Sequence, residues 1–225
     1  MFSEMFYKLL DKGIIQMGVW ETIYMTVLST LFAYLIGMPL GLVLSVTDES
    51  GIHPLPWVNR ILGTLVNIFR SIPFIILMVA MLPIAKFVVG VSLGNKAMIV
   101  VLIIAAAPYV ARMVESSIKE VNAGVIEAAQ AMGTSSFKLV YKVLIPEAKP
   151  SLITNSVIST VTILGYSAMA GIIGGTGLGQ IAITYGYQRY NDDIIWVCVF
   201  LTIVIVQIIQ VVGMRIATKT DRRIN

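Results

Sequence analysis

Charged residues are scarce in this chain. Only 12% of its 225 residues are Asp, Glu, Lys or Arg, whereas a soluble globular protein has about 25%. A soluble domain of this length would need a charged surface around its core, and the mean hydropathy here is +0.88. We therefore predict a membrane protein with lipid around most of its surface.

Cysteine and histidine are nearly absent as well. Cys198 is the single cysteine, so no disulfide can form within the chain, and nothing resembles a metal-binding cluster. There is no G-x-x-x-x-G-K-[ST] phosphate-binding loop, and the glycine-rich stretch 174–179 lacks the lysine that nucleotide binding requires. We expect that stretch to form a tight turn between closely packed helices. No catalytic residue, metal or bound cofactor is expected in this chain.

Long apolar segments are what the chain does contain. A helix needs roughly 20 mostly apolar residues to cross a bilayer. The first segment carries Gly37 and Gly41, a small-xxx-small spacing that permits close helix packing. The prediction is an all-α membrane protein with five transmembrane helices, at residues 22–47, 61–85, 93–111, 152–171 and 194–214.

The basic residues predict the orientation, because they gather on the cytoplasmic side. An odd number of spans puts the termini on opposite sides. With the N-terminus outside and the C-terminus cytoplasmic, the outer side holds five basic residues and the inner side ten. The outer ones are Lys8, Lys12, Lys86, Lys96 and Arg189; the inner ones are Arg60, Arg112, Lys119, Lys138, Lys142, Lys149, Arg215, Lys219, Arg222 and Arg223. Orientation explains the net charge of +4 better than nucleic-acid binding, which is not expected.

Three parts are predicted along the chain. Residues 1–21 form an N-terminal helix that lies on the membrane surface or packs against the bundle. Residues 22–214 form the transmembrane domain, with a cytoplasmic loop at about 115–150, and residues 215–225 form a basic cytoplasmic tail. The apolar residues of the first part recur at helical spacing and are Phe2, Met5, Phe6, Leu9 and Leu10.

The cytoplasmic loop contains a polar stretch, residues 127–146. We expect a short helix capped by Asn122 and ended by Gly133, a residue that accepts positive φ. A second helix is expected from about Ser135 until Pro146 interrupts it. This predicts a helix-turn-helix between two spans, although an ordinary connecting loop is the alternative.

The first of these helices has a face that another protein can approach. Ala128 and Ala129 carry no bulk, so a partner's groove can come close to the backbone, and Glu127 supplies a charge for orientation.

The spacing of this stretch resembles a known family motif. Residues 127–129 are EAA, Gly133 follows after three residues, and residues 143–146 are VLIP after nine more. This resembles the EAA-x3-G-x9-I-x-L-P loop of ABC importer permeases, with Val143 for Ile and Ile145 for Leu. The resemblance implies that Glu127, Ala128, Ala129 and Gly133 dock into a groove on a separate ATPase, and that Pro146 shapes the re-entry into the next span.

The resemblance extends over nearly the whole chain. The segments NIFRSIPF, APYVARMVE and GYSAM, at residues 67–74, 107–115 and 165–169, are similar to the methionine-importer branch of the type I ABC permeases. The resemblance implies the type I importer fold in a bacterial inner membrane. It also implies a second copy of the permease, two ATPase subunits that bind ATP and Mg²⁺, and an extracytoplasmic substrate-binding protein. Importers of other amino acids share parts of these segments and remain an alternative.

The candidates for the substrate path lie in the membrane. Tyr166, Ser167 and Met169 are predicted at mid-span, where Met169 forms a flexible hydrophobic plug or fills the core. Arg70 is costly in hydrocarbon, so it should face the bundle, a polar cavity or the interface, in a structural role or in the path.

Two other classes of membrane protein fit the sequence less well. An ion-driven secondary transporter would need acidic residues inside its spans, and the predicted spans contain none. An intramembrane enzyme would need a nucleophile with its base, or metal ligands, at depth, and the only histidine, His53, lies in a loop.

Overall fold

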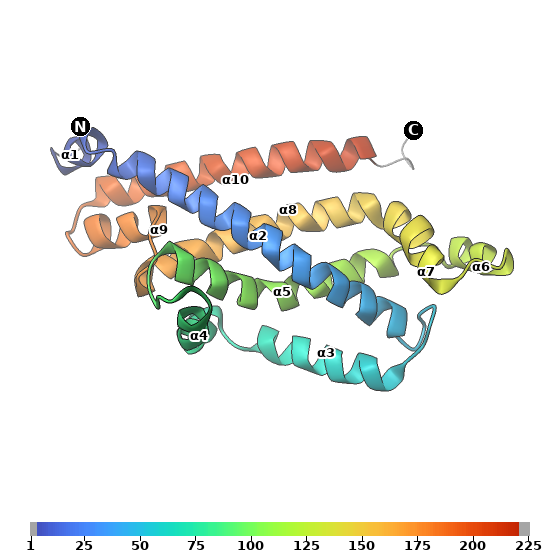
Figure 1. The fold of residues 1–225 in the computed structure, drawn as a ribbon. Coiled ribbons are helices and arrows are strands. Elements are labelled where there is room, and N and C mark those ends of the chain that lie inside the picture. Colours follow the sequence, from blue (N-terminus) through green and yellow to red (C-terminus); the bar gives the residue numbers. More distant parts are fainter. Residues whose placement is uncertain (1–3, 221–225) are drawn as a thin grey trace. The chain divides into compact units, whose positions relative to one another are not determined.

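The computed structural model describes residues 4–220, and these contain helices and no strand, as the sequence predicted. Figure 1 shows the α-helices along the chain. They are α1 (Glu4–Asp11), α2 (Ile14–Thr47), α3 (Pro56–Ser71), α4 (Phe74–Val89), α5 (Asn95–Lys119), α6 (Ala123–Ala131), α7 (Ser136–Leu139), α8 (Ile145–Ala170), α9 (Leu178–Ile181) and α10 (Asp192–Thr220).

Within residues 4–220, four helical stretches are long and apolar enough to cross a membrane. Three of them are α2, α5 and α10, and the fourth is the continuous helical stretch Ser136–Ile173, which contains α8. A fifth crossing exists only if α3 and α4 count together, because they are bent by 110°.

The span predicted at residues 61–85 is therefore broken and is not one continuous helix. Pro73 precedes the first residue of α4 and takes a φ of −54° and a ψ of 133°. A proline disfavours helical backbone in the residue before it, here Ile72, so α3 ends at Ser71. Helix α4 begins directly after Pro73, whose carbonyl accepts the N–H groups of Ile76 and Leu77 at 2.9 and 3.0 Å.

The predicted ends of the chain also differ from the structure. Helix α2 begins at Ile14, directly after Gly13 with its φ of +70°, and not at residue 22. Leu9 of α1 is buried in a core cluster with Ile15, which corresponds to the packed alternative for the N-terminal helix. Arg215 and Lys219, placed in the predicted basic tail, belong to the last turns of α10. Phe2, Arg222 and Arg223 lie outside the described residues.

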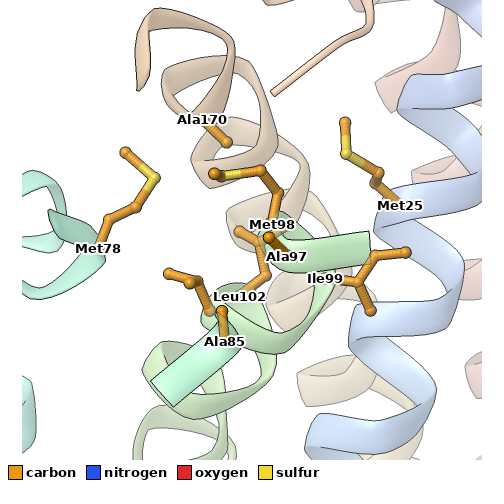
Figure 2. Close-up of a cluster of buried hydrophobic side chains, with 9 residues drawn as sticks. Met25, Met78, Ala85, Ala97, Met98, Ile99, Leu102 and Ala170 are labelled. Carbon is orange, nitrogen blue, oxygen red and sulfur yellow. The ribbon is translucent and has the colours of Figure 1, made fainter. Parts of the chain in front are cut away.

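The chain folds as two compact units. One contains the residues up to Ala33, with Ile72–Ala106 and Thr160–Ile209; the other contains Tyr34–Ser71, Ala107–Ser159 and the residues from Gln210 onward. The core of the first unit is rich in methionine, whose flexible thioether fills irregular spaces well. Figure 2 shows Met25 of α2, Met78 of α4 and Met98 of α5 in this cluster.

The glycine-rich stretch of the first unit is a tight turn, as predicted. Gly174 and Gly177 have φ of +97° and +99°, a region in which L side chains are strained. A Cβ added at Gly179 would overlap the backbone of Ala168. The hydroxyl of Thr22 accepts the Leu178 N–H at 2.9 Å and so fixes the start of α9.

In the second unit, the glycines of α2 allow α5 to approach closely. A Cβ at Gly37 would lie 2.8 Å from the Ala107 carbonyl oxygen, and one at Gly41 would lie 2.7 Å from Val114 Cβ. Both separations are shorter than real Cβ contacts. The small-xxx-small prediction is therefore confirmed.

Candidate functional site

The polar stretch begins with a capped helix. Asn122 has extended backbone, and its side-chain oxygen accepts the Gly124 N–H at 2.8 Å. Helix α6 ends before Gly133, which has a φ of +74° and donates its N–H to the Gln130 carbonyl at 2.9 Å. Both local predictions, the Asn122 cap and the positive φ of Gly133, are confirmed.

Pro146 does not end the helix that follows. Helix α7 continues through a π-helical turn, Val140–Leu144, into α8, whose second residue is Pro146. A proline removes one N–H donor and its ring crowds the preceding turn. The wider turn removes the conflict, because the Ile145 N–H bonds to the Val140 carbonyl, five residues back. The prediction of an interruption at Pro146 is wrong.

The residues of the EAA motif do not all face outward. Glu127, Ala128 and Gly133 are exposed, whereas Ala129 is only 5% exposed and its carbonyl accepts the Thr134 N–H at 3.2 Å. The expectation that the side chains of Ala128 and Ala129 share an open face is therefore wrong for Ala129. The helical turn places it on the inner side of α6.

Three large apolar side chains that follow α6 in the chain are exposed. Met132, Phe137 and Tyr141 are 79%, 82% and 67% exposed. We define six exposed residues of this segment as the α6–α7 surface: Glu127, Ala128, Met132, Gly133, Phe137 and Tyr141.

A cavity of about 440 Å³ lies beside α6. The end of α2 and the loop that follows it contribute Ser45, Val46 and Ser50 to its wall. Helix α6 contributes Ile126 and Glu127.

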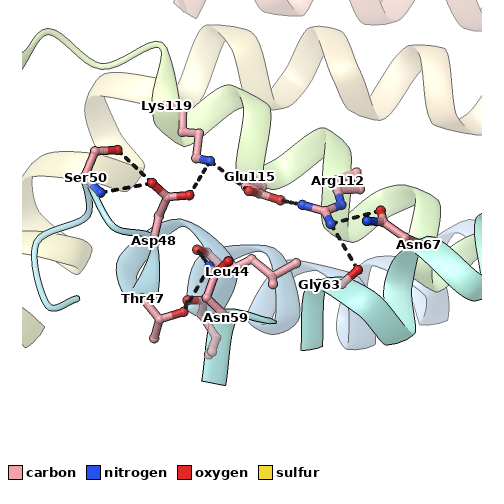
Figure 3. A network of polar contacts seen from close by, with 11 residues as sticks. Leu44, Thr47, Asp48, Ser50, Asn59, Gly63, Asn67, Arg112, Glu115 and Lys119 are labelled. Atoms are coloured by element: carbon pink, nitrogen blue, oxygen red, sulfur yellow. Dashed lines mark hydrogen bonds and ion pairs between the residues drawn. The ribbon is translucent and has the colours of Figure 1, made fainter. Parts of the chain in front are cut away.

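A chain of ionic contacts lies in the second unit, and one of its members, Lys119, also lines this cavity (Figure 3). Glu115 pairs with Arg112 at 2.5 Å and with Lys119 at 2.9 Å, and Lys119 also pairs with Asp48 at 2.8 Å. Arg112 donates further to the carbonyl of Gly63 at 3.1 Å and to the side chain of Asn67 at 3.0 Å.

The carboxylate of Asp48 is held ionised. Hydrogen bonds from the Lys119 ammonium and then from Ser50 lower the pKa of Asp48 from 3.8 to about 2. The stabilisation from this contact is present above pH 3.8 and is lost as the pH falls through about 2. Sequence reasoning missed this network, although the i, i+3 and i, i+4 spacing of Arg112, Glu115 and Lys119 was a visible signal.

The three path candidates of α8 have different surroundings. Ser167 is only 1% exposed and donates to the Leu164 carbonyl of its own helix at 2.7 Å, so it does not line an open path. Tyr166 stacks on Phe74, with ring centroids 4.1 Å apart. Met169 is 46% exposed and is the candidate of the three that presents its side chain outward.

Arg70 lies in the last turn of α3 and is exposed. There its positive charge is favourable beside the negative end of the helix dipole. Among the described residues, no group of three or more His, Cys, Asp or Glu side chains could hold a metal ion.

Residues 37–225 match the family of binding-protein-dependent transport system inner membrane components, and the chain belongs to this family. It is an inner-membrane permease with the type I ABC importer fold.

Individual relatives point to one branch of the family. The chain is 44% identical over 214 residues to a probable D-methionine transport system permease protein, MetI, of Vibrio cholerae, with 95% of each chain covered. It is 41% identical over 206 residues to the methionine import system permease protein MetP of Bacillus subtilis, covering 92% of this chain and 93% of that one. The resemblance to the methionine branch is confirmed.

Solved structures agree. A chain of the MetNI methionine ABC transporter, in an inward-facing conformation, matches with a TM-score of 0.92 and 44% identity, covering 98% of this chain and 100% of that one. A chain of an amino acid ABC transporter crystallised with histidines has a TM-score of 0.79 at 17% identity, a likeness of fold alone.

Proposed function

We propose that this chain is the permease subunit of an ATP-driven methionine importer. The observation that carries the proposal is the 44% identity to a methionine permease over 95% of both chains. Two copies would form the path on their twofold axis, since four or five crossings in one chain are few to enclose a path. An extracytoplasmic binding protein would deliver the substrate.

The α6–α7 surface is the proposed contact with the separate ATPase, which would bind ATP and Mg²⁺. A helix-turn-helix that presents Met132, Phe137 and Tyr141 to solvent is poorly suited to a plain connector. Burying these apolar side chains in a partner's groove would be favourable. This role requires the surface to be cytoplasmic, which agrees with an N-terminus outside and a C-terminus inside.

The substrate assignment has a direct test. The permease, co-purified with its ATPase and reconstituted with the native binding protein, is expected to take up methionine in preference to other L- and D-amino acids. The measurement is ATP-dependent uptake of each labelled amino acid into proteoliposomes. A marked preference for an amino acid other than methionine would leave the importer class intact and overturn the substrate.

Met169→Ala is expected to raise basal ATPase activity or substrate leak. Its exposed, flexible side chain would close the path between two permease copies, and truncation to a methyl group would open it. The measurement is ATP hydrolysis without binding protein, with methionine efflux from loaded proteoliposomes. Met17→Ala, also at an exposed methionine, is the matched control. Basal activity and leak equal to wild type in Met169→Ala would contradict the plug.

A further inference from the structure

The ionic chain of the second unit connects three parts of the fold. At one end, Arg112 of α5 bonds to Gly63 and Asn67 of α3. At the other end, Lys119, the last residue of α5, pairs with Asp48 in the loop that follows α2. Figure 3 shows these contacts as one continuous line.

Glu115 joins the two ends. Its two carboxylate oxygens go to different cations, Oε2 to Arg112 and Oε1 to Lys119. The residue is only 5% exposed, and a carboxylate so far from water is tolerable because both cations neutralise it. Loss of its charge would therefore disconnect Arg112 from Lys119.

The Asp48 end is anchored in its own loop. The carboxylate accepts the N–H and the hydroxyl of Ser50 at 3.1 and 2.7 Å. The Gly51 N–H bonds to the Asp48 carbonyl at 2.9 Å. Because Asp48 is fixed in an ordered turn, a displacement of Lys119 would move the whole turn and not only the Asp48 side chain.

This chain of contacts ends next to the α6–α7 surface. Lys119 is three residues before Asn122, the cap of α6. The cavity of about 440 Å³ is lined by Ser50, Lys119 and Glu127 of α6, among others. The two residues between Lys119 and Asn122 form a short covalent link from the ionic chain to α6.

We propose that Glu115 is a positioning residue for coupling. Through Arg112 and Lys119 it makes α3, α5 and the loop after α2 move together when a partner displaces α6. This inference rests on the proposed function, because the displacement would come from the ATPase.

The test compares how much methionine is transported for each ATP hydrolysed. Glu115→Gln keeps the shape of the side chain and removes its charge. Lys119→Met removes the outer link at a side chain that is 44% exposed, so it spares the folded structure even if Glu115→Gln prevents assembly. Lys119→Arg retains a cation that can reach both carboxylates, and Glu120→Gln removes an exposed charge just beyond the link.

In proteoliposomes with binding protein, Glu115→Gln and Lys119→Met are expected to lower the ratio of uptake to ATP hydrolysis about fivefold or more, the lower end of usual site-to-site coupling. Lys119→Arg and Glu120→Gln should keep the wild-type ratio. A wild-type ratio in Lys119→Met, or an equal loss in Lys119→Arg or Glu120→Gln, would overturn the role of the ionic chain. Absence of methionine uptake by the wild type would instead overturn the proposed function.

Discussion

Gly133→Asp is expected to abolish coupled transport while leaving the membrane helices folded. A Cβ added at Gly133 meets no other part of the described chain within 4 Å. The new carboxylate would therefore point away from this chain, toward the proposed ATPase contact. An unpaired charge at such an interface costs about 2 kcal/mol or more. We expect methionine uptake to fall on the order of 30-fold or more, the change that this energy corresponds to.

Gly133→Asn separates charge from backbone strain. Both Asn and Asp tolerate positive φ better than other L residues, and the two side chains have nearly the same size. Binding of the ATPase subunit to each purified permease, by co-purification, measures the contact itself. Uptake by Gly133→Asp close to the wild-type rate would show that the α6–α7 surface is only a connector.

Gly41→Leu is expected to prevent the permease from folding. A Cβ at Gly41 would overlap the Ala111 carbonyl oxygen and lie 2.7 Å from Val114 Cβ. Because the nearest atoms include backbone of α5, no rotation of a side chain can relieve the contact. Overpacking of this kind costs about 1–3 kcal/mol even when the surroundings yield. The expected result is loss of the monodisperse peak in size-exclusion chromatography in detergent.

Gly165→Leu is the matched control on α8. A Cβ at Gly165 has no contact within 4 Å in the described chain, and leucine is a better helix former than glycine by about 1 kcal/mol. This variant should elute as the wild type does. Normal elution of Gly41→Leu would mean that α2 and α5 do not pack closely at the glycines of α2.

Features that a short sequence pattern specifies were predictable from the sequence. The cap at Asn122 and the positive φ of Gly133 depend on local backbone chemistry, and both are observed. Gly37 and Gly41 were identified because only small residues let two helix backbones come close. The spacing of the EAA motif likewise led to the family that the comparisons show.

Features that depend on packing were not predictable in the same way. Hydropathy cannot tell a straight span from one bent by 110°, so the break before α4 was missed. A proline predicts an interruption, yet at Pro146 a π-helical turn lets the helix continue. The inward positions of Ala129 and Ser167 depend on which side of each helix meets the rest of the chain.

Identifying the energy source for methionine uptake is the most direct test of the proposed function. The permease and its co-purified ATPase would be placed in proteoliposomes with the binding protein, and uptake of labelled methionine would be measured with ATP, with a non-hydrolysable ATP analogue, and with proton or sodium gradients alone. We expect uptake only with hydrolysable ATP supplied on the side of the α6–α7 surface. Uptake driven by an ion gradient without ATP would contradict the assignment as an ATP-driven importer.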